Sequence, residues 1–84
     1  MKAHVKNYLK RFDIGQEDTW FCEVCGRQDH IVNFEIHHIV FRSHCGGDDI
    51  SNIICLCKNC HRKAHTNVNA AVYKAAHEIF LENH

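Results

Sequence analysis

The 84-residue chain contains no proline, no internal repeat and no low-complexity stretch, so nothing in it marks a linker between domains. It also contains no apolar run close to the roughly 20 residues that a membrane-spanning helix requires. The first residues, MKAHVKNYLKRF, lack the apolar centre of a secretory signal. We therefore expect a single cytoplasmic domain over residues 1–84 that has no membrane partner.

The chain also lacks a net charge. Ten basic and ten acidic residues give a formal charge of zero, so no overall positive field announces nucleic acid. Basic residues nevertheless gather in two places. The first twelve residues carry Lys2, Lys6, Lys10 and Arg11 with no acid, and Lys58, Arg62 and Lys63 form a second group. Solvated helix faces explain both groups as well as phosphate contacts do.

Cysteine and histidine, by contrast, are abundant, with six and nine copies. A chain this short buries a limited core, and such domains usually need a disulfide framework, a metal or a partner subunit. Cysteine pairs in cytoplasmic proteins bind metal more often than they form disulfides. A secreted disulfide scaffold is the alternative, and the missing secretory signal disfavours it.

Four of the cysteines form two C-x-x-C motifs, CEVC and CKNC, separated by 31 residues. Each motif can present two thiolates to one ion, and four thiolates complete a closed tetrahedron around Zn²⁺. We predict a structural zinc site made by Cys22, Cys25, Cys57 and Cys60. Cys55 is then expected to be a buried free thiol and Cys45 a thiol in a loop.

Hydrophobic periodicity divides the chain into three zones. Residues 1–19 hold a short amphipathic helix over 3–12, followed by a loop. Residues 20–66 hold strands over 31–40 and 52–56, the turn HCGGDD between them, and a helix from Cys57 to about His65. Residues 67–84 hold a final helix over 69–83. Its buried face is expected to contain Val72, Ala76, Ile79 and Phe80, with His77 on the surface.

The stretch FEIHHIVF places two adjacent histidines in the first of these strands. Successive side chains of a strand point to opposite faces, so His37 should share a face with Glu35 while His38 points away. His61 and His65 are four residues apart on the following helix, where they can bind one ion together.

EIHHI, the turn GGDD, the asparagine of DISNIICLC and the final CKNCHRKAH together resemble an HNH endonuclease over roughly residues 20–66. The resemblance implies a small α+β fold with a ββα-metal core, in which two antiparallel strands and a helix surround a catalytic divalent ion. The two C-x-x-C motifs are typical of members that carry a structural zinc. The helices at both ends lie outside the resemblance.

The resemblance also implies a role for each site residue. His37, His61 and His65 would hold the divalent ion, and His38 would be the general base that activates water. Asn52 would hold the loop and the base in position, and Glu35 would support the metal ligands through hydrogen bonds. The chemistry agrees, because an unliganded histidine, with its usual pKa of about 6.5, suits a base, and a metal stabilises charge on the phosphoryl group.

These roles predict cofactors and partners. Three imidazoles favour Mn²⁺, with Ni²⁺, Co²⁺ or Zn²⁺ as alternatives, over the oxygen-seeking Mg²⁺. One site per chain predicts that a monomer nicks one strand of DNA. Phosphate contacts are expected from Arg42, His44, Lys58, Arg62 and Lys63. The alternatives are a zinc-supported module that binds nucleic acid or protein without cutting, a nuclease that acts on RNA or on mixed substrates, and a zinc domain with surface histidines.

Overall fold

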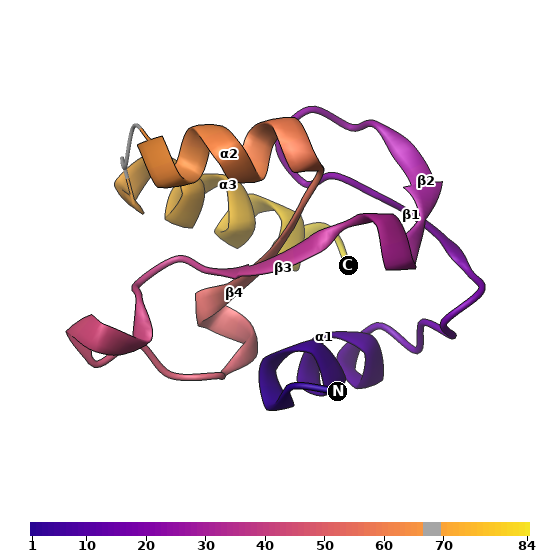
Figure 1. Cartoon of the computed structure of the whole chain (residues 1–84), viewed down its shortest axis with the longest axis horizontal. Helices are drawn as coiled ribbons and strands as arrows, with labels where there is room; N and C mark the ends of the chain where they lie inside the picture. Colours follow the sequence, from indigo (N-terminus) through magenta and orange to yellow (C-terminus); the bar gives the residue numbers. More distant parts are fainter. Residues whose placement is uncertain (67–69) are drawn as a thin grey trace.

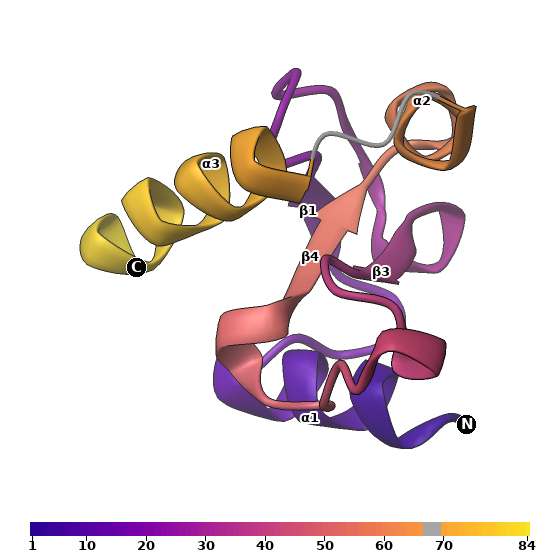
Figure 2. The same cartoon turned by 90° about the vertical axis from the view of Figure 1, so that its left-hand side faces the viewer.

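Two antiparallel strands, β3 (Glu35–His38) and β4 (Ile53–Leu56), form the centre of the fold, and helices pack on both sides of them (Figures 1 and 2). The computed structural model describes residues 1–66 and 70–84. Helix α1 (Ala3–Arg11) lies on one side of the strand pair, and α2 (Lys58–Thr66) and α3 (Ala70–Asn83) lie on the other. This small α+β architecture, with a ββα unit made by β3, β4 and α2, confirms the predicted fold class.

Burial of β4 anchors the core. Its residues Ile53, Ile54, Cys55 and Leu56 are all 0% exposed, which fits the continuous apolar run of a strand covered on both faces. The register pairs Glu35 with Leu56 and His38 with Ile53, so the histidine pair lies opposite the start of β4. Side chains from α1, among them the fully buried Tyr8, complete the core.

The first strand is shorter than the predicted range 31–40. Ile31–Asn33 forms a 3₁₀ turn, η1, and β3 ends at His38. Beyond His38 the backbone of Val40 bonds to the side chain of Asn52 instead of a neighbouring strand, which ends the regular pairing. Asn52 itself lies in the 3₁₀ turn η3 (Ile50–Asn52) just before β4, and a third such turn, η2 (Arg42–His44), lies in the loop. The predicted second strand therefore loses only its first residue.

A hairpin that the sequence pattern did not predict carries the first cysteine pair. Strands β1 (Thr19–Phe21) and β2 (Gln28–His30) pair antiparallel, and CEVC lies in the turn between them. Gly26 closes this turn with a φ of 78°, a left-handed conformation that favours glycine, and its N–H donates to the carbonyl of Cys22. The hairpin therefore presents Cys22 and Cys25 at one tip.

Helices α1 and α2 confirm the predicted segments to within one residue at their ends. No helix in the described ranges is both long and apolar enough to cross a membrane.

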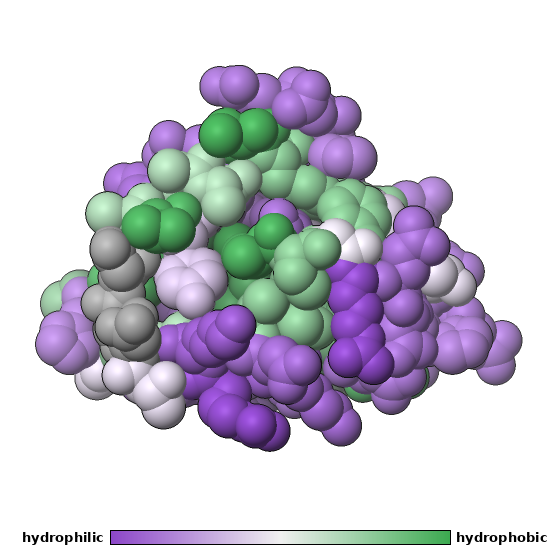
Figure 3. All heavy atoms as spheres, turned by 90° about the horizontal axis from the view of Figure 1, so that it is seen from above, coloured by the Kyte–Doolittle hydropathy of each residue, from purple (hydrophilic) through white to green (hydrophobic). Residues whose placement is uncertain are grey.

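The last helix exposes part of the face that was predicted to be buried. Phe80 is buried as expected, but Val72 and Ile79 are 59% and 61% exposed. His77, expected on the surface, is fully buried because Glu23 and the carbonyl of Ile50 provide partners for both ring nitrogens. The face above α2 and α3 gathers apolar atoms in its middle and hydrophilic atoms along its edges (Figure 3). The predicted first residue of this helix, Asn69, lies outside the described residues.

Candidate functional site

The four cysteines of the two C-x-x-C motifs meet beside the start of α2. Their sulfur atoms all lie within 4.8 Å of one another, and Cys25 Sγ lies 3.6 Å from Cys57 Sγ. A tetrahedral zinc with Zn–S bonds of about 2.3 Å requires sulfur separations of roughly 3.8 Å, so the cluster fits the ion. Burial acts to raise the pKa of Cys57, but hydrogen bonds from the Cys60 amide and the neighbouring thiols lower it to about 7. Burial and the neighbouring thiols raise the pKa of Cys60, so the four-thiolate state would depend on the bound ion itself.

The two remaining cysteines lie where the sequence placed them. Cys55 is a buried free thiol in β4, where burial raises its pKa, and Cys45 is exposed in the loop after η2.

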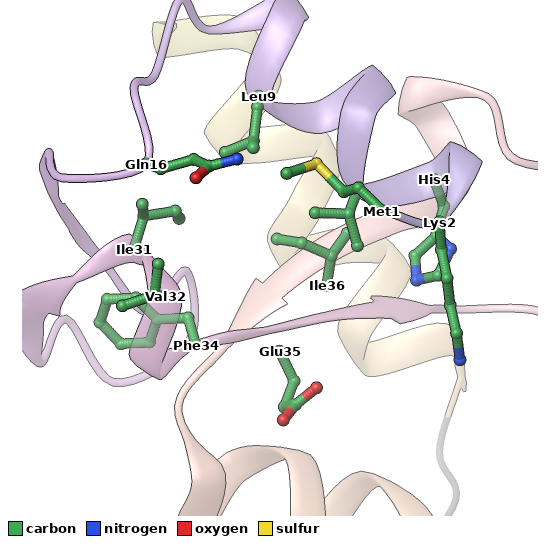
Figure 4. A pocket seen from close by; sticks show the side chains of 11 residues that line it. Met1, Lys2, His4, Leu9, Gln16, Ile31, Val32, Phe34, Glu35 and Ile36 are labelled. Carbon is green, nitrogen blue, oxygen red and sulfur yellow. The ribbon is translucent and has the colours of Figure 1, made fainter.

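Alternation along β3 separates the two adjacent histidines. Glu35 and Ile36 leave the strand on opposite sides, with Ile36 toward α1 and Glu35 toward α2 (Figure 4). His37 lies on the α2 side with the rings of His61 and His65, whereas His38 lies on the α1 side against His4. The two histidines therefore belong to different clusters.

His37, His61 and His65 form the first cluster. The ring of His37 lies 5.2 Å from each of the other two, and His61 Nε2 lies 3.0 Å from His65 Nε2. Burial, followed by the charges of His61 and His65, lowers the pKa of His37 to about 4. Burial and then His65 lower the pKa of His61 as well. Imidazole nitrogens that lie this close together suit a divalent transition metal, so the donor set fits the ion that the motif implies.

Phe41 supports this cluster, a contribution that sequence reasoning missed. Its ring stacks on His65 at 5.7 Å and 15° and meets His37 edge-on at the same distance. The apolar contact restricts both imidazoles. The spacing of Phe41 in FEIHHIVF offered no signal for this contact, because the residue follows the end of β3.

His38 belongs to a second cluster with His4 and Asp48. His38 Nε2 lies 2.7 Å from Asp48 Oδ1, and the ring of His4 lies 4.3 Å from that of His38. The hydrogen bond with His38 lowers the pKa of Asp48. Sequence reasoning missed both partners. Asp48 was assigned only to the turn GGDD, and no spacing rule connects α1 with this strand.

Asn52 fixes the loop that carries Asp48. Its side-chain carbonyl accepts the Val40 N–H at 2.8 Å, and its amide donates to the carbonyls of Val40 and Gly47 at 3.0 and 2.8 Å. The loop is tight at Gly46, where a Cβ atom would lie 1.7 Å from the Val40 carbonyl oxygen. Asn52 therefore sets the path of the chain between His38 and Asp48.

An open hollow of about 550 Å³ borders both histidine clusters. Arg42, Lys2 and Glu35 line it. The negative charge of Glu35 acts to raise the pKa of His61, against the larger effects of burial and His65. No hydrogen bond among the described residues joins Glu35 to a histidine.

The other predicted phosphate contacts do not border this hollow of about 550 Å³. His44 lines a smaller hollow, and three basic residues are exposed on α2, namely Lys58, Arg62 and Lys63. A mostly apolar hollow of about 420 Å³ adjoins the site and shares Lys2, His4, Glu35 and Ile36 with it (Figure 4).

Comparison with known proteins finds similarity to one family and to one curated relative. A family model described as HNH endonuclease matches residues 22–67, a span that includes both cysteine pairs, His37, His38, Asn52, His61 and His65. The type IV methyl-directed restriction enzyme EcoKMcrA of Escherichia coli (strain K12) is 33% identical over 75 residues. The similarity covers 82% of this chain and 27% of that relative, so the chain spans about a quarter of its length.

Proposed function

The chain belongs to the HNH endonuclease family and is a nuclease, and from that premise we propose that it hydrolyses phosphodiester bonds of DNA with a divalent metal. One observation carries the proposal. His38 borders the same hollow as the three-histidine cluster, yet it lies outside that cluster. A ligand set and a separate unliganded base are the two parts that metal-assisted hydrolysis requires. The name of the E. coli relative, a restriction enzyme, supports DNA as the substrate.

His38 is the general base in this proposal. Asp48 Oδ1 accepts a hydrogen bond from the Nε2–H group of His38 at 2.7 Å, which leaves the lone pair of Nδ1 free to take a proton from water. The carboxylate then balances the positive charge that the ring acquires. Asp48 is therefore a positioning residue that fixes the tautomer, while Asn52 fixes the loop that carries it.

His37, His61 and His65 would hold the catalytic ion. When bound, a divalent ion supplies Lewis-acid stabilisation of the charge that develops on the phosphoryl group and on the leaving oxygen. The three imidazoles leave further positions open and favour Mn²⁺, Ni²⁺, Co²⁺ or Zn²⁺ over Mg²⁺. Glu35 lies on the α2 side of β3, as His37 does, and its carboxylate places a negative charge near His61 (Figure 4).

Cys22, Cys25, Cys57 and Cys60 would hold a structural zinc. Their thiolates fill a tetrahedron and leave no position for substrate. An ion held there would connect the β1–β2 hairpin to the start of α2, the helix that carries His61 and His65. The structural metal would thereby keep the catalytic helix in place.

Phosphate binding would begin with Lys2 and Arg42, which line the hollow. Lys58, Arg62 and Lys63 lie on the exposed surface of α2, where they would contact the nucleic acid beyond the scissile bond, and His44 would do so from η2. A single site per chain would nick one strand of a duplex, and we propose that the monomer acts in the cytoplasm.

Relaxation of supercoiled plasmid by the metal-loaded chain tests the proposal. Wild type should nick the plasmid with Mn²⁺ faster than with Mg²⁺. His38→Ala should lose that activity while it retains the metal of the four-cysteine and three-histidine sites, and His30→Ala, an exposed histidine on β2, is the matched control. Equal nicking by His38→Ala would refute the assigned base. Plasmid binding without nicking by wild type would instead indicate a zinc-supported binding module, and faster cleavage of RNA would overturn the choice of DNA.

A further inference from the structure

We propose that His4, His38 and Asp48 form an additional site for Zn²⁺ or a similar transition metal, and that metal binding there prevents His38 from acting as the base. The site is distinct from the three-histidine cluster and from the four cysteines. Its effect on activity rests on the proposed function, but its affinity for metal does not.

The donor set and its geometry suit a zinc ion. Nitrogens of His4 and His38 and an oxygen of Asp48 all lie within 4.8 Å of one another. Two imidazoles and one carboxylate are a common catalytic-type zinc set, with ligand bonds of about 2.0–2.2 Å. Tetrahedral bonds of that length separate ligand atoms by about 3.4 Å. The 2.7 Å contact between His38 and Asp48 would therefore have to widen slightly, which a small rotation of the 28% exposed Asp48 side chain would provide.

The imidazole of His4 lies close to the other two donors. It is 9% exposed, and its ring centroid lies 4.3 Å from that of His38. Burial and the neighbouring His38 lower the pKa of His4, which favours the neutral ring that a metal requires.

The cluster depends on a helix outside the nuclease motif. The family model matches residues 22–67, whereas His4 lies on α1, which packs against β3. The three-histidine cluster lies on the opposite side of the same strand. A metal on the α1 side would therefore occupy a different site from the catalytic ion that the HNH motif implies.

Metal at this site would change the tautomer of His38. Without it, the protonated Nε2 donates a hydrogen bond to Asp48, and Nδ1 holds the free lone pair. A metal on Nε2 takes the lone pair of that nitrogen, so the single proton of the neutral ring resides on Nδ1. Nδ1 then has no lone pair to accept a proton from water, and the carboxylate of Asp48 becomes a ligand. Excess zinc should therefore inhibit a nuclease that lower zinc leaves active.

Metal content separates this proposal from the proposed function. Wild type, His4→Ala, Asp48→Asn and the control His30→Ala are stripped with a chelator and titrated with Zn²⁺ by calorimetry. Thermal unfolding in zinc establishes that each variant is folded. Wild type and His30→Ala should bind one equivalent more than His4→Ala and Asp48→Asn. Equal stoichiometry in all four overturns the proposal whether or not the chain cuts DNA, and Asp48→Asn decides the question if His4→Ala does not fold.

Zinc inhibition of nicking tests whether metal at this site prevents His38 from acting as the base. With Mn²⁺ at a saturating concentration, plasmid nicking is measured against added Zn²⁺, and each variant is normalised to its own uninhibited rate. His4→Ala should require about tenfold more zinc, or a still higher concentration, for half-inhibition than wild type and His30→Ala. Identical curves would mean that zinc inhibits by replacing Mn²⁺ at the three-histidine cluster, which overturns the proposal. Failure of wild type to nick at all would count against the proposed function, and the zinc stoichiometry would still decide this site.

Discussion

His77 Nδ1 lies 2.6 Å from Glu23 Oε1, with both side chains fully buried and 54 positions apart in the sequence. The second carboxylate oxygen accepts the Tyr8 hydroxyl at 2.6 Å and the Cys55 amide at 3.0 Å. A single carboxylate thus connects α3, α1 and β4 to the hairpin that carries Cys22. Buried polar groups need such partners, and Glu23 satisfies several at once.

Replacing His77 should make the protein less stable, most of all at low pH. Burial acts to lower the pKa of His77, but the hydrogen bonds to Glu23 and to the Ile50 carbonyl outweigh it and raise the pKa above the usual 6.5. The protonated ring therefore stabilises the fold fully below about pH 6.5, and this contribution disappears as the pH rises through the folded-state pKa. His77→Gln should lower the free energy of unfolding by about 3–5 kcal/mol at low pH, because Glu23 loses its buried partner.

Urea unfolding of zinc-saturated protein, from about pH 6 to about pH 9, measures this difference. The exposed His30 supplies the control, since His30→Gln should change stability little at any pH. A gap between wild type and His77→Gln that stayed constant across this range would show that His77 is not charged in the fold.

Two adjacent residues of α2, Cys60 and His61, should respond in opposite ways to substitution. Cys60 is 8% exposed and faces the other cysteines, whereas His61 faces His37. Cys60→Ser should release the structural zinc and lower the melting temperature by on the order of 10 °C, which corresponds to about 2 kcal/mol in a domain this size. His61→Ala should leave the melting temperature much closer to wild type but slow nicking by about 100-fold or more.

Metal content and thermal unfolding, measured on the same samples of Cys60→Ser and His61→Ala, check this prediction. Each variant should lose one equivalent of metal, but from a different site. If both changes affected stability equally, the division of α2 into a structural and a catalytic face would be wrong.

The sequence predicted the parts of this site that depend on local spacing. Two C-x-x-C motifs place their thiolates within reach of one ion, and His61 and His65 share a helix face because they are four residues apart. The opposed directions of His37 and His38 follow from the alternation of a strand. The order of β3, β4 and α2 was likewise readable from the hydrophobic pattern and the glycine turn.

Contacts between distant segments could not be read in this way. Most residues near His77 in the sequence are apolar, and only the fold shows that Glu23 is bonded to its ring. His4 meets His38 because α1 packs on β3, a placement that no local rule encodes. The early end of β3 depends on Asn52, whose side chain replaces a strand partner for Val40.

The loop between the histidine pair and Asn52 should tolerate alanine at Gly47 but not at Gly46. A Cβ atom at Gly46 would lie 1.7 Å from the Val40 carbonyl oxygen, so the backbone would have to move, at a cost of about 1–3 kcal/mol. At Gly47 the nearest atom is the Asp49 carboxylate at 3.1 Å, a flexible side chain that can rotate away. Gly47→Ala should therefore change stability by no more than about 0.5 kcal/mol.

Urea unfolding and plasmid nicking by the two variants measure this prediction. Gly46→Ala should also nick more slowly, since the displaced loop moves Asp48 relative to His38. Equal stability of the two variants would show that the loop can relax without strain.

Asp48 and Asp49 offer the sharpest comparison for the proposed base. Asp48 Oδ1 lies 2.7 Å from His38 Nε2, whereas Asp49 is exposed beside Gly47. An amide at position 48 can donate to Nε2, which would shift the ring proton to Nδ1 and remove the lone pair that takes a proton from water. Asp48→Asn should therefore lower kcat by about 10²–10⁴-fold with little change in KM, because the change alters the chemical step rather than substrate binding.

Asp49→Asn makes the same change of charge one residue away and should retain a kcat close to wild type. Initial rates of plasmid nicking at several DNA concentrations, with Mn²⁺ saturating and zinc limited to the structural site, separate kcat from KM for both variants. A loss shared equally by the two variants would indicate that the loop's negative charge matters but the tautomer of His38 does not. A loss confined to Asp48→Asn, with KM unchanged, is the result that a positioned base requires, because only the oxygen bonded to Nε2 determines which nitrogen of His38 is free.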